Sequence, residues 1–150
     1  MERRTFLSLG FGALVLAAVP ASVRAEDFRK LKPNAWTAKT VDDAVKALYG
    51  TTATIAKGVT VVTPDVASNG GAVPVQVTSD IDAKTVAIFE DANPESCVIV
   101  YDLNEHSIID FSIKIKMKKS GTISAVVEGK DGKLYSGSKS LEVALGGCEG

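Results

Sequence analysis

The sequence predicts an all-β domain: an immunoglobulin-like β-sandwich of about seven or eight strands, with one short helix before it and a flexible C-terminal tail. From Thr51 onward, short runs rich in β-branched residues are separated by turn formers. Apolar and polar side chains alternate in Phe111–Met117, as in a strand with one buried face. The strand–helix alternation of a nucleotide-binding α/β fold is missing, and a small barrel is the alternative arrangement.

The predicted strands share β-branched or alternating composition, and they are Val59–Val62, Val73–Thr78, Thr85–Phe89, Cys97–Leu103, Ile108–Met117, Thr122–Glu128, Leu134–Gly137 and Ser140–Leu145. Between two of them, Glu128–Lys133 is a hairpin signal in which Gly132 suits a positive φ. Ile108–Met117 is a candidate partner surface, because both of its faces could be covered.

A single short helix is expected over Val41–Tyr49. Thr40 is a plausible N-cap, acidic residues follow it, apolar residues recur at helical spacing, and Gly50 stops the run. Residues 26–39, which contain Pro33 and the single tryptophan, are expected to form an irregular lead-in.

Residues 1–25 have the pattern of an export signal. Arg3 and Arg4 precede an apolar run from Leu9 to Val19, and a small-residue cleavage site follows at Val23–Ala25. The paired arginines favour the twin-arginine type, which exports folded proteins to the periplasm, over an ordinary Sec signal. The expected organisation is a signal over 1–25, a lead-in over 26–39, the sandwich with its helix over 40–145, and a tail over 146–150.

The charge excludes two classes of partner. The whole chain carries a formal charge of −1, and residues 1–25 contribute +2 through three arginines and one glutamate, which leaves −3 on the mature part. Without a basic run, neither nucleic acid nor an anionic membrane surface is an expected partner.

Catalytic constellations are sparse. The single histidine, His106, lies in a polar connection, where it is expected to be solvated; a Cys148–His106 nucleophile pair is the remote alternative. Two cysteines and one histidine do not make a convincing zinc site, so no metal or cofactor is expected. Cys97, at the head of an apolar strand, is expected to be a buried thiol, although an intermolecular or a Cys97–Cys148 disulfide is possible in an exported protein.

The last six residues place a thiol on a glycine stalk: Leu145, Gly146, Gly147, Cys148, Glu149 and Gly150. Glycine offers no side chain to pack and is costly to order, so this tail is expected to be mobile. A mobile terminal thiol indicates a group that is presented to another protein.

Together these residues resemble the SoxY family, the sulfur-carrier subunits of the periplasmic thiosulfate-oxidising Sox system. The resemblance is carried by the paired arginines, the helix Val41–Gly50, the stretch Pro64–Val75, the Asn93-Pro94 turn and the Gly-Gly-Cys ending. It covers nearly the whole mature chain, and the tail is its most specific mark.

The resemblance implies a covalent carrier that is not itself an enzyme. Cys148 would hold sulfur intermediates, and Gly146 and Gly147 would let the tail swing. The domain would pair with a SoxZ-like β-sandwich. A c-type haem enzyme like SoxAX would join thiosulfate to Cys148 as an S-thiosulfonate, a manganese hydrolase like SoxB would release sulfate, and a sulfane dehydrogenase would follow in some organisms.

Two residues depart from the family pattern. Glu149 stands where a Gly-Gly-Cys-Gly-Gly ending has glycine, and with the terminal carboxylate it disfavours the Cys148 thiolate. This predicts activation by partner sites, and it leaves room for a carrier that serves a different sulfur enzyme. Cys97 is outside the family motif. The alternative to the carrier is an exported interaction module that uses its tail cysteine for an intermolecular disulfide.

Overall fold

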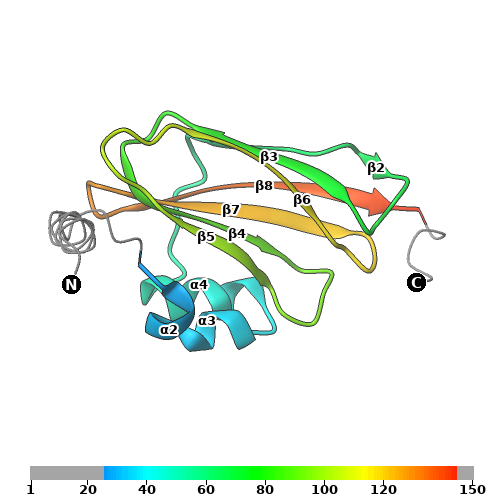
Figure 1. The fold of residues 1–150 in the computed structure, drawn as a ribbon, viewed down its shortest axis with the longest axis horizontal. Coiled ribbons are helices and arrows are strands. Elements are labelled where there is room, and N and C mark those ends of the chain that lie inside the picture. Colours follow the sequence, from blue (N-terminus) through cyan, green and yellow to red (C-terminus); the bar gives the residue numbers. More distant parts are fainter. Residues whose placement is uncertain (1–25, 145–150) are drawn as a thin grey trace, which may run out of the picture.

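The computed structural model describes residues 26–144, which form a β-sandwich with helices on one side (Figure 1). One sheet has three strands in the order β1-β3-β6, and the other has five in the order β2-β8-β7-β4-β5. The strands are β1 (Val59–Val62), β2 (Val66–Ala67), β3 (Val73–Ser79), β4 (Ala83–Glu90), β5 (Cys97–Asp102), β6 (Ile109–Ile115), β7 (Gly121–Gly129) and β8 (Leu134–Val143). Two separate sheets confirm the sandwich rather than the barrel.

Helix α4 (Val41–Tyr49) has the predicted bounds. The Thr40 hydroxyl accepts a hydrogen bond from the backbone N–H of Asp43 at 3.1 Å, and Gly50 ends the helix in the left-handed region with φ of 81°. Because glycine has no Cβ, it adopts this conformation without strain.

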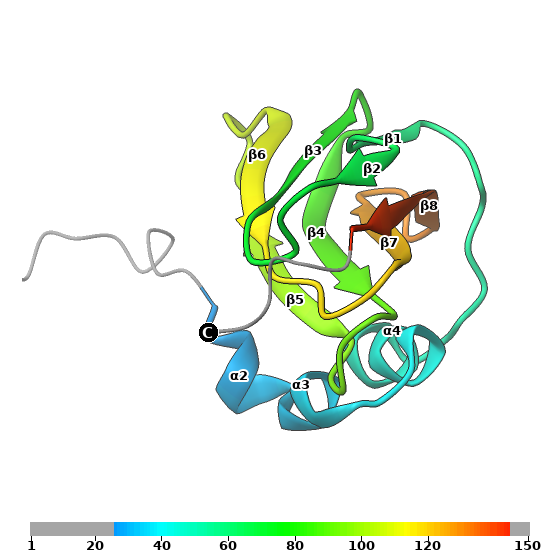
Figure 2. The ribbon, with the colours of Figure 1, turned by 90° about the vertical axis from the view of Figure 1, so that its right-hand side faces the viewer.

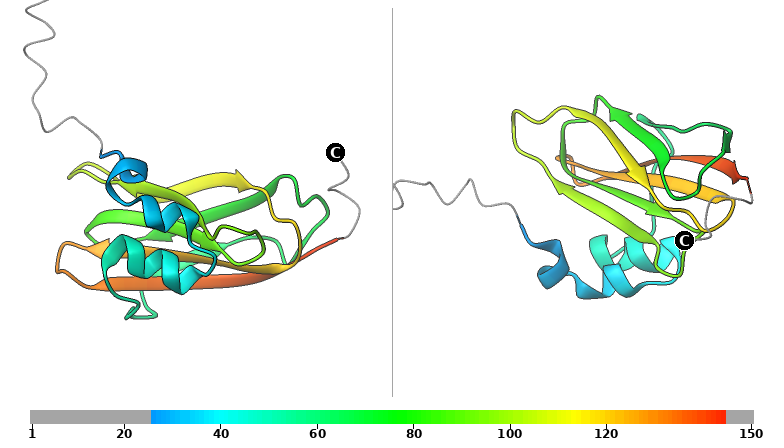
Figure 3. Two further views of the ribbon diagram at one scale, coloured as in Figure 1. Left: turned by 90° about the horizontal axis from the view of Figure 1, so that it is seen from below. Right: turned by 45° about the vertical axis from the view of Figure 1, so that its right-hand side comes forward.

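The irregular lead-in was a wrong prediction, as was the expectation of a single helix. Two short helices, α2 (Phe28–Leu31) and α3 (Pro33–Thr37), precede α4. Pro33 begins α3, where its missing N–H costs nothing, so it starts a helix instead of interrupting one. Trp36 lies under the Arg29 guanidinium, 4.1 Å from the ring centroid. Seen from below, the three helices lie across the five-stranded sheet (Figure 3).

Strand β4 of the five-stranded sheet is buried on both faces. In β4, Val86 and Ile88 belong to the core between the two sheets, whereas Ala87 and Phe89 belong to a second core under the helices. This explains why Thr85–Phe89 is a continuous apolar run, since a strand covered on both faces has no polar side.

Most predicted strands are present with bounds shifted by one or two residues. The two runs Leu134–Gly137 and Ser140–Leu145 are wrong as separate strands, because β8 is continuous and pairs with β7 across the intervening residues. β2 was not predicted. The β7–β8 hairpin is confirmed, with Gly132 at φ of 80°.

One side of the sandwich is closed and the other is open. On the closed side β1 crosses β8 so tightly that a Cβ on Gly137 would collide with the carbonyl oxygen of Val59. On the open side, β5 and β6 are the edge strands of their sheets (Figure 2). There the rings of Tyr101 and Phe111 stack with centroids 4.2 Å apart, which joins the two edges.

Candidate functional site

Strand β8 carries the chain toward the predicted carrier tail, and its end is held by strands on both sides. β7 pairs with it antiparallel, and β2 pairs with it parallel, with Val66 opposite Glu142 and Ala67 opposite Val143. The stretch Pro64–Val75 contains β2 and the start of β3. This stretch therefore holds the end of β8 in place through the β2–β8 pairing, which we call the β2 clasp.

Hydrogen bonds fix the backbone as far as the last described residue. The Val143 N–H donates to Ser120 Oγ at 2.9 Å, and the Ala144 N–H donates to the Ala67 carbonyl at 2.9 Å. The predicted site residues Gly146, Gly147, Cys148, Glu149 and Gly150 lie outside the described residues. Four residues span at most about 14 Å, so covalent geometry keeps the Cys148 Cα within that distance of Ala144.

An ion pair reinforces the clasp. Lys139 Nζ on β8 lies 2.6 Å from Asp65 Oδ1, just before β2. The lysine holds the pKa of the Asp65 carboxyl below its usual range through a hydrogen bond and its charge. The Glu142 N–H also donates to the Asp65 carbonyl at 2.8 Å. Asp65 thus contacts β8 through both its backbone and its side chain.

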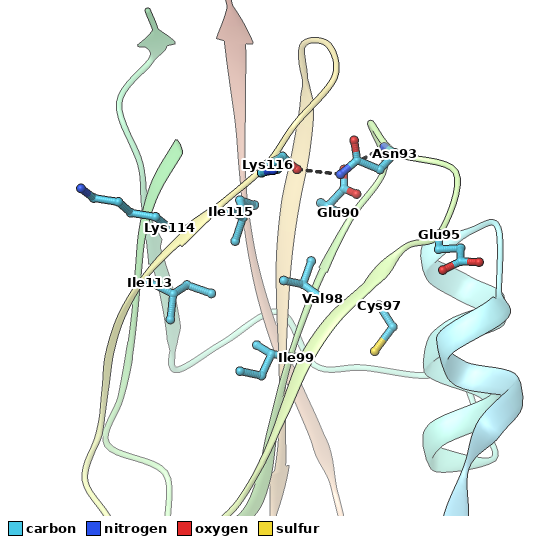
Figure 4. A pocket seen from close by; sticks show the side chains of 10 residues that line it. All are labelled: Glu90, Asn93, Glu95, Cys97, Val98, Ile99, Ile113, Lys114, Ile115 and Lys116. Carbon is cyan, nitrogen blue, oxygen red and sulfur yellow. Dashed lines mark hydrogen bonds between the residues drawn. The ribbon is translucent and has the colours of Figure 1, made fainter. Parts of the chain in front are cut away.

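At the same end of the sandwich, Asn93 joins two connections (Figure 4). Its Nδ2 donates to the Lys116 carbonyl at 2.6 Å, and its Oδ1 accepts from the Lys118 N–H at 3.1 Å. The β4–β5 connection is therefore bonded to the β6–β7 connection, which carries Ser120. Sequence reasoning identified the Asn93-Pro94 turn and missed this bridge, because its acceptors are backbone atoms distant in sequence.

A buried carboxylate shapes the β4–β5 connection. Glu90 is 1% exposed, and one oxygen accepts the N–H groups of Ala92 at 2.6 Å and Asn93 at 3.0 Å. Burial raises the pKa of the Glu90 carboxyl, and the two N–H donors oppose that rise. Asp91 accepts the Thr122 N–H at 2.7 Å, and a Cβ on Gly121 would collide with this Asp91 oxygen.

Below these connections a cleft of about 460 Å³ opens between β5 and β6. Val98, Ile99, Ile113 and Ile115 project toward it, with lysines on the β6 side (Figure 4). The cleft has an apolar floor and a mixed rim, which suits contact with a protein chain better than binding of a small anion.

Cys97 is a buried thiol, as predicted. It packs in the core under the helices with Phe89 and Val126, and burial raises its pKa to about 12. The thiolate is the reactive form of cysteine, so burial makes this thiol a poor nucleophile in the folded protein.

His106 is exposed, and its Nε2 lies 3.4 Å from Glu105. It belongs to the β5–β6 connection, at the end of the sandwich opposite the end of β8. The seven residues of β6 between the two ends span roughly 20 Å, which exceeds the reach of Cys148 from Ala144. This geometry disfavours a Cys148–His106 catalytic pair.

Within residues 26–144, no group of three or more His, Cys, Asp or Glu residues could hold a metal ion. No helix in that range is long and apolar enough to cross a membrane.

A family model and one solved structure point to the same family. The sequence model of the family "Sulfur oxidation protein SoxY" matches residues 45–148. The solved structure of the sulfur carrier protein SoxY from Chlorobium limicola f thiosulfatophilum is similar, with 28% identity, a TM-score of 0.61, and coverage of 70% of this chain and 96% of that chain.

More distant structures share the fold alone. A superoxide reductase (neelaredoxin) from Ignicoccus hospitalis has 15% identity and a TM-score of 0.53, and covers 59% of this chain and 81% of its own. Among curated proteins, no sequence matches. Because the family match covers more than half of the chain, the protein belongs to the SoxY family.

Proposed function

We propose that this protein is a periplasmic sulfur carrier that holds thiosulfate-derived intermediates covalently on Cys148. The observation that supports this most is the extent of the family match, which runs from α4 through the sandwich and ends at residue 148, the cysteine itself. A solved structure similar to this chain is that of a sulfur carrier protein.

The chemistry begins with the Cys148 thiolate. Its Sγ would form a bond with the outer sulfur of thiosulfate, which gives the S-thiosulfonate Cys148 Sγ–S–SO₃⁻. The two electrons released would pass to a SoxAX-like partner, whose c-type haem would supply the oxidising power. A SoxB-like hydrolase then adds water to the terminal sulfonate. Sulfate and protons leave, and a persulfide remains on Cys148. A sulfane dehydrogenase oxidises that sulfur where one is present.

In this scheme the domain is a platform and the partners are the catalysts. The β2 clasp and the Ser120 bond fix the chain up to Ala144, and Gly146 and Gly147 let Cys148 enter the partner sites. The negative charge of Glu149 would disfavour the Cys148 thiolate, so basic or metal-bearing partner sites would activate the thiol. The chain itself needs no cofactor, and it pairs with a SoxZ-like subunit.

Export precedes this chemistry. We propose that residues 1–25 are a twin-arginine signal, because Arg3 and Arg4 precede the apolar run. Replacing both arginines with lysine should leave the precursor in the cytoplasm, whereas a Sec signal would tolerate the change.

Intact-mass measurement of the mature protein from cells oxidising thiosulfate tests the carrier role. Adducts of about 112 Da for S₂O₃, or steps of about 32 Da for sulfur, are expected on the wild type and absent from Cys148→Ser. Only reduced protein, or a disulfide dimer of twice the mass, would contradict the carrier and favour an interaction module.

A further inference from the structure

The exposed face of β6, the edge strand of its sheet, carries charges of both signs. Asp110 and Lys114 lie two residues before and two residues after Ser112. Asp110, Ser112 and Lys114 are the exposed residues of β6, and they alternate with the buried or half-buried Ile109, Phe111, Ile113 and Ile115. In the described part of the chain, β6 pairs only with β3, so its other edge has no strand partner. An unpaired edge is a template for pairing with another strand.

The charges on this strand are not matched within their own sheet. The β3 residues opposite Asp110, Ser112 and Lys114 are Thr78, Gln76 and Pro74, none of which is charged. Asp110 accepts a hydrogen bond from Gln76 Nε2 at 2.7 Å through one oxygen. No ion pair of Lys114 is found among residues 26–144.

We propose that the β6 edge binds a second copy of this chain, strand against strand and antiparallel, with Ser112 on the two-fold axis. In that register Asp110 of each copy faces Lys114 of the other, so the interface contains two Asp110–Lys114 ion pairs. Opposite charges directly across an antiparallel pair stabilise it, and a two-fold interface requires such self-complementarity.

The same register matches the apolar residues. Phe111 faces Ile113 and Ile109 faces Ile115, so the half-buried side chains along the open side of the sandwich are covered. Beyond the strand, the 80% exposed side chain of Ile108 meets the aliphatic stem of Lys116. Two three-stranded sheets thereby become one continuous sheet of six.

This dimer keeps the two β8 ends apart. β8 and β6 both end near the Asn93 bridge, and antiparallel pairing of β6 places those ends at opposite sides of the two-fold axis. The association therefore needs no disulfide. It rests on the sandwich alone and not on the carrier chemistry.

Cross-linking tests the register directly. In the full mature chain carrying Cys148→Ser, Ser112→Cys brings two Cα atoms about 4.5–5.5 Å apart, within the range of a disulfide. Thr78→Cys on β3 is the control, since three strand spacings of about 4.8 Å separate its two copies and both interface charges are kept. Mild oxidation should give dimers from Ser112→Cys and few from Thr78→Cys; equal yields would overturn the register.

Charge reversal tests the energetics in the same Cys148→Ser background under reducing conditions. Asp110→Lys or Lys114→Asp alone places like charges opposite each other at two points and should weaken dimerisation about tenfold in sedimentation across a dilution series. The combined exchange should restore it. A chain that stays monomeric, or single changes without effect, would overturn the proposal and would leave this edge to a SoxZ-like partner. Neither result bears on adducts at Cys148.

Discussion

The Asn93 bridge gives a sharp test of how the tail end of the sandwich is held together. Asn93→Ala removes two side-chain hydrogen bonds, one to the Lys116 carbonyl and one from the Lys118 N–H. Each such bond contributes about 0.5–1.5 kcal/mol net, and exposure to water favours the lower half. The expected loss in the free energy of unfolding is therefore about 1–2 kcal/mol, or roughly 3–8 °C in Tm for a domain of this size.

Asn93→Asp separates the two bonds. It keeps an oxygen that accepts the Lys118 N–H, and it replaces the donor with an oxygen facing the Lys116 carbonyl at the present 2.6 Å. We expect destabilisation at least as large as in Asn93→Ala, measured by thermal and urea unfolding of the mature chain. Asn104→Ala is the matched control, because its side chain accepts only within its own loop. An Asn93→Asp variant as stable as wild type would refute the bridge.

Two further predictions concern buried groups. In the Cys148→Ser variant, Cys97 should not react with a thiol reagent at pH 8 until the protein unfolds, because burial raises its pKa to about 12; rapid reaction of the folded protein would contradict this. For Glu90, burial raises the folded-state pKa above the ordinary 4.5, so its contribution to stability is present below that pH and is lost as the pH rises through the folded pKa. Glu90→Gln keeps an oxygen for the Ala92 and Asn93 N–H groups and should flatten this pH dependence in urea unfolding. An unchanged slope would exclude Glu90 as its source.

Local sequence signals predicted the elements that depend least on tertiary contacts. α4 has its own cap and stop, so its bounds follow from Thr40 and Gly50. The run Val59–Val62 is a strand because β-branched residues and flanking turns agree. In these places the local preference and the tertiary structure point the same way.

Tertiary contacts decided the rest. Ser138 and Lys139 separated the two predicted runs, yet β7 pairs with β8 across them, and Gly137 is needed because β1 crosses there. β2 has only two residues, so its identity depends on pairing with β8. The lead-in forms helices because it covers the five-stranded sheet, as Ala35 packs in the core beneath them.

The candidate site also has one part that the sequence predicts and another that only tertiary contacts determine. The sequence alone singled out Cys148 and its glycines, because a cysteine that directly follows two glycines is recognisable without knowledge of the fold. The clasp by Asp65 and the bond from Ser120 join residues that lie 74 and 23 positions from their partners, so no local pattern predicts them.

The central claim is that Cys148 is the sulfur attachment point, and peptide mapping tests it most directly. Trypsin cleavage after Lys84, Lys114 and Lys139 separates the two cysteines, with Cys97 in peptide 85–114 and Cys148 in peptide 140–150. After turnover with thiosulfate and the partner enzymes, added mass of about 112 or about 32 Da should appear on peptide 140–150 only. Adducts on peptide 85–114, or an unmodified peptide 140–150 during active thiosulfate oxidation, would contradict the account.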